Sequence, residues 1–186
     1  MKKKNAKTIL VALGTLAAFA LWTFLIRCVD VQPIGPNGSR VGFAAINGAF
    51  HALTGVHWAL YTLTDWLGLV PIGIALGFAV LGLVQLIRRK SLLKVDRDIL
   101  ILGGFYIVVL AAYLLFETVV INFRPVLIDG KLEASYPSST TMLALCILPT
   151  AMMQLKTRIR SDAVRRAILG ILAAFTVFMV VGRLIS

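Results

Sequence analysis

Three short stretches of the sequence place anion-binding residue types next to long apolar runs. Arg124 carries a planar, permanently charged guanidinium that suits phosphate oxygens, and Pro125 stiffens the chain beside it. The stretch 138–140 opens a predicted helix, where free backbone N–H groups and the positive end of the helix dipole attract anions. Arg183 lies near the end of the last apolar run, where a charge is costly without a partner or a function. Phosphate binding is the chemistry that these three stretches share.

Each of these residues also has a purely structural interpretation. Arg124 alone can anchor the chain by reaching lipid headgroups. Ser138 and Thr140 alone can be helix N-caps. Arg183 can form an ion pair inside a helical bundle, with Glu117 as the acid. The anion-binding interpretation therefore depends on the three stretches acting together on one side of a membrane.

The composition points to a membrane protein. Of the 186 residues, 59% are hydrophobic and only 15% are charged, whereas soluble domains carry about 25% charged residues. Mean hydropathy is +0.91. These values exclude an ordinary soluble enzyme, a disordered tail and a disulfide scaffold. The two cysteines, Cys28 and Cys146, lack the spacing of a metal site, and we expect neither a metal nor another cofactor.

The apolar runs predict a single all-α integral membrane domain over residues 1–186. A helix needs about 20 apolar residues to cross a bilayer. The first run is longer than the apolar region of a signal peptide and is not followed by a cleavage-site pattern, so we expect it to be an uncleaved span. We expect about five transmembrane helices, near residues 8–26, 66–87, 99–120, 138–155 and 167–186.

Basic residues predict the orientation of these spans. The formal net charge is +11, and 14 of the 19 Lys and Arg residues fall in three clusters, at the N-terminus, at 88–97 and at 156–166. All three clusters face the cytoplasm only if the ambiguous segment 41–60 does not cross the membrane. We therefore expect 41–60 to be an interfacial or re-entrant helix on the outer face of the plasma membrane. The N-terminus is then cytoplasmic, and the polar loop 121–140 is outside. No basic patch with interleaved aromatics predicts nucleic-acid binding.

The order and spacing of the anion-binding stretches resemble the type 2 phosphatidic acid phosphatase superfamily of membrane lipid phosphatases. That family carries K-x6-R-P, then P-S-G-H, then S-R-x5-H-x3-D. Arg124-Pro125 matches the end of the first motif, Pro137-Ser138-Ser139 the start of the second, and Gly182-Arg183 the start of the third. The resemblance covers residues 117–186. It implies phosphate binding by Arg124, Ser138, Ser139 (through its N–H) and Arg183, without a metal, in a fold that normally has six spans.

The chain departs from the family pattern at the positions of the reacting residues. Glu117 stands where the family has the lysine of its first motif, and Thr140 stands where it has the general-acid histidine. The nucleophilic histidine would come six residues after Arg183, beyond Ser186, so we expect no catalytic residue in this chain and no activity from it alone. His57 is a possible substitute acid, although an interfacial polar role is the preferred interpretation.

The resemblance implies a phosphoric monoester or diphosphate hydrolase. Its substrate would be a lipid phosphate or an isoprenoid diphosphate at the outer membrane face, cleaved through a phosphohistidine. The alternative is a non-catalytic protein that binds a phospholipid or another anion, or that serves as a partner subunit. Glu117 and Thr140 favour this alternative, because they change two motif positions. Either function involves membrane lipid as the partner; the oligomeric state is open.

Overall fold

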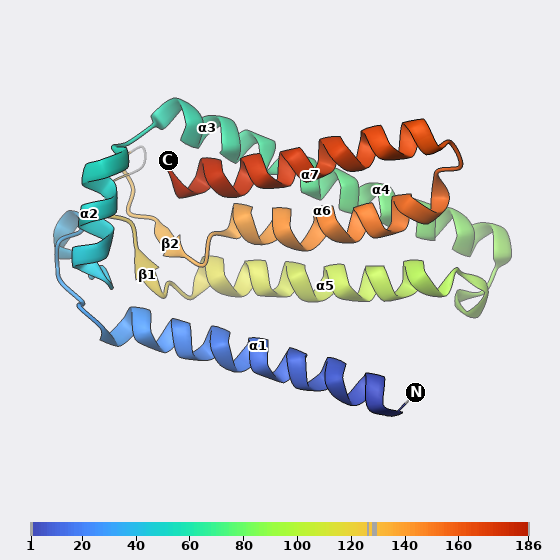
Figure 1. Cartoon of the computed structure of the whole chain (residues 1–186), viewed down its shortest axis with the longest axis horizontal. Helices are drawn as coiled ribbons and strands as arrows, with labels where there is room; N and C mark the ends of the chain where they lie inside the picture. Colours follow the sequence, from blue (N-terminus) through green and yellow to red (C-terminus); the bar gives the residue numbers. More distant parts are fainter. Residues whose placement is uncertain (1, 126, 128–129, 186) are drawn as a thin grey trace. The chain divides into compact units, whose positions relative to one another are not determined.

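The chain folds into helices that form two compact units (Figure 1). The computed structural model describes residues 2–125, 127 and 130–185. Unit 1 comprises the residues up to Leu53 together with Val119–Pro137, and unit 2 comprises Thr54–Thr118 together with the residues from Ser138 onward.

Unit 1 contains one long helix, one short helix and a small hairpin. The helices are α1 (Lys2–Cys28) and α2 (Ala44–Thr54), with the single turn η1 (Pro36–Gly38) between them. The strands β1 (Asn122–Phe123) and β2 (Ala134–Tyr136) pair antiparallel.

Polar side chains hold the loop of unit 1 against its hairpin. The side chain of Asn122 accepts a hydrogen bond from the Gly42 N–H at 2.8 Å and donates one to the Ser135 hydroxyl at 3.0 Å. A Cβ at Gly42 would lie 1.8 Å from the backbone oxygen of Ile26, so only glycine permits this close approach. The Asp30 carboxylate accepts from the Ala45 N–H at 2.6 Å, which caps α2 and lowers the pKa of Asp30.

Unit 2 is a bundle of helices. Its elements are α3 (Trp58–Leu67), α4 (Leu69–Arg89), the single turn η2 (Leu92–Lys94), α5 (Arg97–Thr118), α6 (Ser139–Arg158) and α7 (Asp162–Leu184). Local chemistry explains several helix ends. Basic residues in the last turn of α4, and Asp98 and Asp162 in the first turns of α5 and α7, complement the helix dipoles.

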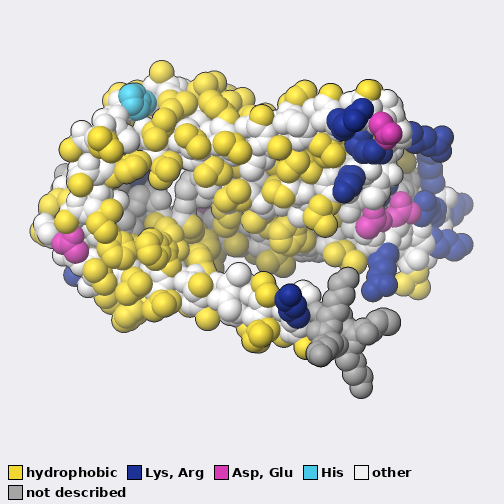
Figure 2. Space-filling view, in the orientation of Figure 1, with side chains coloured by type: hydrophobic (Ala, Val, Ile, Leu, Met, Phe, Trp, Pro, Cys, Tyr) yellow, Lys and Arg dark blue, Asp and Glu magenta, His cyan; other side chains and the backbone are white. Residues whose placement is uncertain are grey.

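Helix α6 lies at the centre of unit 2 and packs against α4, α5 and α7. One of its faces places Leu143 and Ile147 against Val109 of α5. Another places Ala144 and Leu148 against Met179 of α7. The core of unit 2 is therefore built around α6, while large hydrophobic side chains of the other long helices point outward (Figure 2).

Four helical segments in the described part of the chain are long and apolar enough to cross a membrane: Ala6–Cys28, Trp58–Arg89, Arg97–Thr118 and Asp162–Leu184. These segments, with their outward-facing hydrophobic surfaces, indicate a multi-pass helical membrane protein. The fifth expected span, near 138–155, corresponds to α6, which is not one of the four. Hydroxyl residues at its start and Lys156 and Arg158 at its end shorten its apolar part. Five spans therefore stay a prediction.

The segment expected to form one interfacial helix over 41–60 is divided in the structure. Helix α2 ends at Thr54, and α3 begins at Trp58 after Gly55, which has a positive φ of 71°. Helix α3 continues almost directly into α4 through Gly68, giving a segment of 32 residues from Trp58 to Arg89. At 1.5 Å per residue these rise about 48 Å, against about 30 Å for the hydrocarbon core. This segment is therefore longer than one straight crossing, and an interfacial position for 41–60 stays a prediction.

Candidate anion-binding site

Arg183 lies near the end of α7 with its side chain only 7% exposed. Its Nη2 donates to Thr140 Oγ1 at 3.2 Å and to Asp65 Oδ1 at 3.4 Å, and its Nη1 donates to the backbone oxygen of Tyr61 at 3.5 Å. The guanidinium carbon lies 4.5 Å from the centre of the Tyr61 ring. Its Nε is buried and has no hydrogen-bond acceptor in the described part of the chain. The permanent charge of Arg183 is thus held by long hydrogen bonds, and its Nε makes none within the described residues.

Two of these partners were not identified from the sequence. Tyr61 and Asp65 are four residues apart on α3, so both face α7 from adjacent turns. The carboxylate that meets Arg183 is thus that of Asp65, whereas the sequence analysis considered Glu117. An acidic residue within an otherwise apolar helix was the signal that could have indicated Asp65.

The first turn of α6 supplies the third side of the site. Ser138 is the N-cap, and its hydroxyl accepts from the Thr141 N–H at 3.3 Å. Its backbone oxygen accepts from the Met142 N–H at 2.9 Å. In a helix the first N–H groups lack partners, and those of Ser139 and Thr140 have no acceptor within the described residues. The capping interpretation of Ser138 is therefore correct, and the backbone of this turn retains N–H groups for an anion.

A close contact between α3 and α7 places Arg183 beside this turn. Gly182 is buried, and a Cβ there would lie 2.7 Å from Cγ2 of Thr64, whose side chain is fully buried. Thr64 donates its hydroxyl to the backbone oxygens of Leu60 and Tyr61, so it is anchored to its own helix. The absence of a side chain at Gly182 therefore sets the distance between Arg183 and α3.

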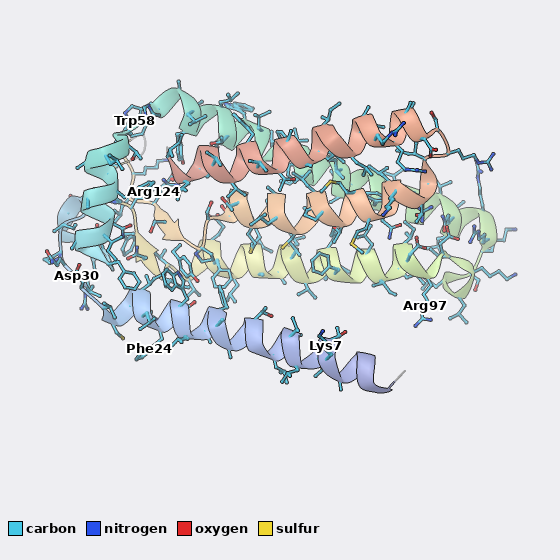
Figure 3. All side chains as sticks on the ribbon, viewed as in Figure 1. Lys7, Phe24, Asp30, Trp58, Arg97 and Arg124 are labelled. Atoms are coloured by element: carbon cyan, nitrogen blue, oxygen red, sulfur yellow. The ribbon has the colours of Figure 1, made fainter. Side chains whose placement is uncertain are left out.

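Arg124 belongs to unit 1, where it follows β1 beside the short hairpin (Figure 3). Its N–H donates to the backbone oxygen of Glu133 at 3.0 Å, and its Nε lies 3.8 Å from the carboxylate of Glu133. The structure therefore brings Arg183 together with the first turn of α6 inside one unit, while Arg124 has its own acidic neighbour in the other unit.

Glu117 and His57, the other two residues singled out from the sequence, lie in unit 2 with exposed side chains. Glu117 is in the last turn of α5, and His57 occupies the N-cap position of α3 without making a side-chain cap. No ion pair joins Glu117 to Arg183 in the described residues. No group of three or more His, Cys, Asp or Glu side chains in that part of the chain could hold a metal ion.

Comparison with known proteins assigns no family: no protein-family model, no curated protein and no solved structure matches the chain.

Proposed function

We propose that this protein binds the phosphate group of a membrane lipid where Arg183 meets the first turn of α6. The observation that carries the proposal is the buried guanidinium of Arg183, whose Nε has no acceptor among the described residues. The unused N–H groups of Ser139 and Thr140 belong to the helix turn that this guanidinium contacts. A phosphate oxygen accepts from both kinds of donor. The side chain of Asp65 is 59% exposed, so it can turn towards solvent and admit an anion.

The resemblance to the type 2 phosphatidic acid phosphatases also implies phosphate binding by Arg124, which belongs to unit 1. In that family two arginines stabilise the charge that develops on the transferring phosphoryl group. We place the site at the outer membrane face, as the positive-inside rule predicts.

In the first candidate function, the protein hydrolyses the bound lipid phosphate or isoprenoid diphosphate through a phosphohistidine. The family's nucleophile comes six residues after its third-motif arginine, a position that lies past Ser186. The hydroxyl of Thr140, at the general-acid position, accepts a hydrogen bond from Arg183. A threonine hydroxyl is far too weak an acid to protonate a leaving group at neutral pH.

A non-catalytic binding protein is the second candidate. Two contacts favour it: Thr140 serves as a partner of Arg183, and Asp65 neutralises part of the arginine charge. In that case the protein would hold a phospholipid headgroup, or present it to a partner subunit.

Orthovanadate binding to the purified full-length protein in lipid nanodiscs tests the shared part of both candidates. We expect Arg183→Lys to weaken binding about tenfold or more, because lysine cannot offer the planar guanidinium fork and a charged hydrogen bond contributes about 1.5–3 kcal/mol. Arg40→Lys, an exposed arginine of unit 1, is the matched control. Equal affinity in the wild type, Arg183→Lys and Arg40→Lys would overturn the proposal.

Release of inorganic phosphate from vesicles containing phosphatidic acid separates the two candidates. Vanadate binding together with phosphate release that Arg183→Lys abolishes supports the phosphatase. Vanadate binding without phosphate release, in the protein expressed from its natural gene, supports the non-catalytic function.

A further inference from the structure

A dense group of basic residues lies at the end of unit 2 where α4 leads into α5 and α6 leads into α7 (Figure 2). We call this surface the basic end. It carries ten basic residues against three acidic ones, Asp96, Asp98 and Asp162. The basic residues are Arg88, Arg89, Lys90, Lys94, Arg97, Lys156, Arg158, Arg160, Arg165 and Arg166.

Ion pairs join the two connections into one surface. Asp96 accepts from Arg89 Nη1 at 2.8 Å and lies 3.6 Å from Arg158 Nη1, while Nη2 of Arg158 donates to Asp98 at 2.9 Å. Gln85 also donates to Asp96 at 2.8 Å. The hydrogen bond from Arg89 is the main cause of the lowered pKa of Asp96. The carboxylates therefore hold the surface together, and most of its positive charge stays uncompensated.

Two leucines project from the middle of the basic end. In the η2 turn, Leu93 is 95% exposed and Leu92 is 61% exposed, and Lys90 and Lys94 lie within three residues of Leu93. Both leucines lie between α4 and α5, outside the segments that are long and apolar enough to cross a membrane. Apolar side chains among exposed cations are typical of surfaces that bind at the boundary between lipid headgroups and acyl chains.

We infer that the basic end binds the headgroups of anionic phospholipids and that Leu93 inserts among their acyl chains. The position of the charges favours lipid over an acidic protein. Arg88 and Arg89 form the last turn of α4, and Arg97 begins α5, so these cations lie within a turn of membrane-length helices, at headgroup depth. The inference concerns the end of unit 2 away from Arg183 and does not depend on phosphate binding there.

The lipid preference of the full-length protein in vesicles tests this inference. Spin-labelled phosphatidylglycerol and phosphatidylcholine report how strongly each lipid associates with the protein. We expect the wild type to prefer phosphatidylglycerol. In the triple variant Arg88→Gln, Lys90→Gln, Lys94→Gln, the preference for phosphatidylglycerol should be at least fivefold weaker. Each basic residue near an anionic surface strengthens binding to it about fivefold. The variant keeps Arg89 and Arg158, so the ion pairs remain.

The matched control variant removes three positive charges from unit 1 and leaves the basic end unchanged. Arg27→Gln, Arg40→Gln and Lys131→Gln change three exposed basic residues of unit 1, and this variant should keep the wild-type preference. A wild type that shows no preference, or a control that loses as much as the basic-end variant, would overturn the inference. Raising the salt concentration should weaken the preference by screening.

A separate fluorescence measurement tests whether the η2 turn inserts into the bilayer. An environment-sensitive fluorophore is attached to Leu93→Cys, with Cys28 and Cys146 replaced by alanine, and the same label is attached to Arg40→Cys as the control. We expect the emission from position 93 to shift to shorter wavelength and to be quenched by brominated acyl chains. Both effects should be stronger when phosphatidylglycerol is present. Emission typical of water, in either lipid, would show that Leu93 does not insert and would overturn that part of the inference.

Discussion

Arg183 is a permanent charge enclosed by an aromatic ring, a carboxylate and a hydroxyl. Burial of a guanidinium is costly unless its hydrogen bonds are satisfied, yet its contacts are 3.2–3.5 Å long and its Nε has no acceptor within the described residues. The Tyr61 ring shields one face of the group. This arrangement is the one that the proposed anion site requires, and it contributes little stability by itself.

Asp65 is the residue with which the proposed anion would compete for Arg183. We expect Asp65→Asn to bind orthovanadate about fivefold more tightly, because a nearby negative charge that repels the anion, worth roughly 1 kcal/mol at a hydrated site, is removed. Titration of the purified protein measures the change. Asp98→Asn, which alters an exposed carboxylate paired with Arg158 at the basic end, should leave the affinity unchanged. Weaker binding by Asp65→Asn would instead show that Asp65 positions Arg183 for the anion.

Helices α6 and α7 both set the geometry around Arg183. Helix α6 has the buried face that organises unit 2, so its first turn is held at a defined place. Helix α7 approaches α3 closely because Gly182 meets Thr64 without a side chain between them. The geometry around Arg183 depends on these contacts between helices.

Gly182→Ala tests the contact between α3 and α7. The added methyl group would lie 2.7 Å from Thr64 Cγ2, so we expect a loss of stability of about 1–3 kcal/mol, measured by thermal unfolding in detergent. Thr64→Ser removes the methyl group and keeps the hydroxyl, so it should restore most of the loss in the double variant. Gly73→Ala, where no atom lies within 4 Å of the added Cβ, is the control. Equal losses from both glycine substitutions would contradict the packing argument.

On the scale of the whole molecule, charge and hydropathy together predict how the chain crosses the membrane. Both basic connections of unit 2 lie at one end, joined by the contacts of Arg158 with Asp96 and Asp98. Figure 3 marks the two ends of unit 2 with Trp58, at the start of α3, and Arg97, at the start of α5. This separation of charge is what the positive-inside rule requires of neighbouring spans.

Cysteine labelling of intact cells tests the topology. In a background with Cys28 and Cys146 replaced by alanine, we expect Ser135→Cys to react with an impermeant maleimide from outside. Lys94→Cys should react only after the membrane is permeabilised, because the positive-inside rule predicts that the basic end faces the cytoplasm. Protection of position 135 in intact cells, or labelling of position 94, would reverse the proposed orientation.

The helical and membrane character of the protein could be predicted from the sequence, because hydropathy is a local property summed along the chain. Length and composition predicted apolar helices, and the structure confirms this with four segments of sufficient length and hydropathy. The predicted cap at Ser138 is also local, since an N-cap needs only the residues of its own turn. The number of spans and the outer-face position of 41–60 depend on the bilayer and stay predictions.

Sequence alone predicted the apolar helices and the residue types that could bind an anion, Arg124, Ser138, Ser139 and Arg183, whereas the short hairpin of β1 and β2 was not predicted. Only the tertiary structure decided that Arg183 meets Asp65, Tyr61 and Thr140. Arg183 and these partners lie on three helices, α3, α6 and α7, and residues on different helices are more than 40 positions apart along the chain. No local pattern encodes such a meeting. Its physical cause is packing: α6 fills the centre of unit 2, and Gly182 lets α7 approach α3 closely enough for the guanidinium to reach them.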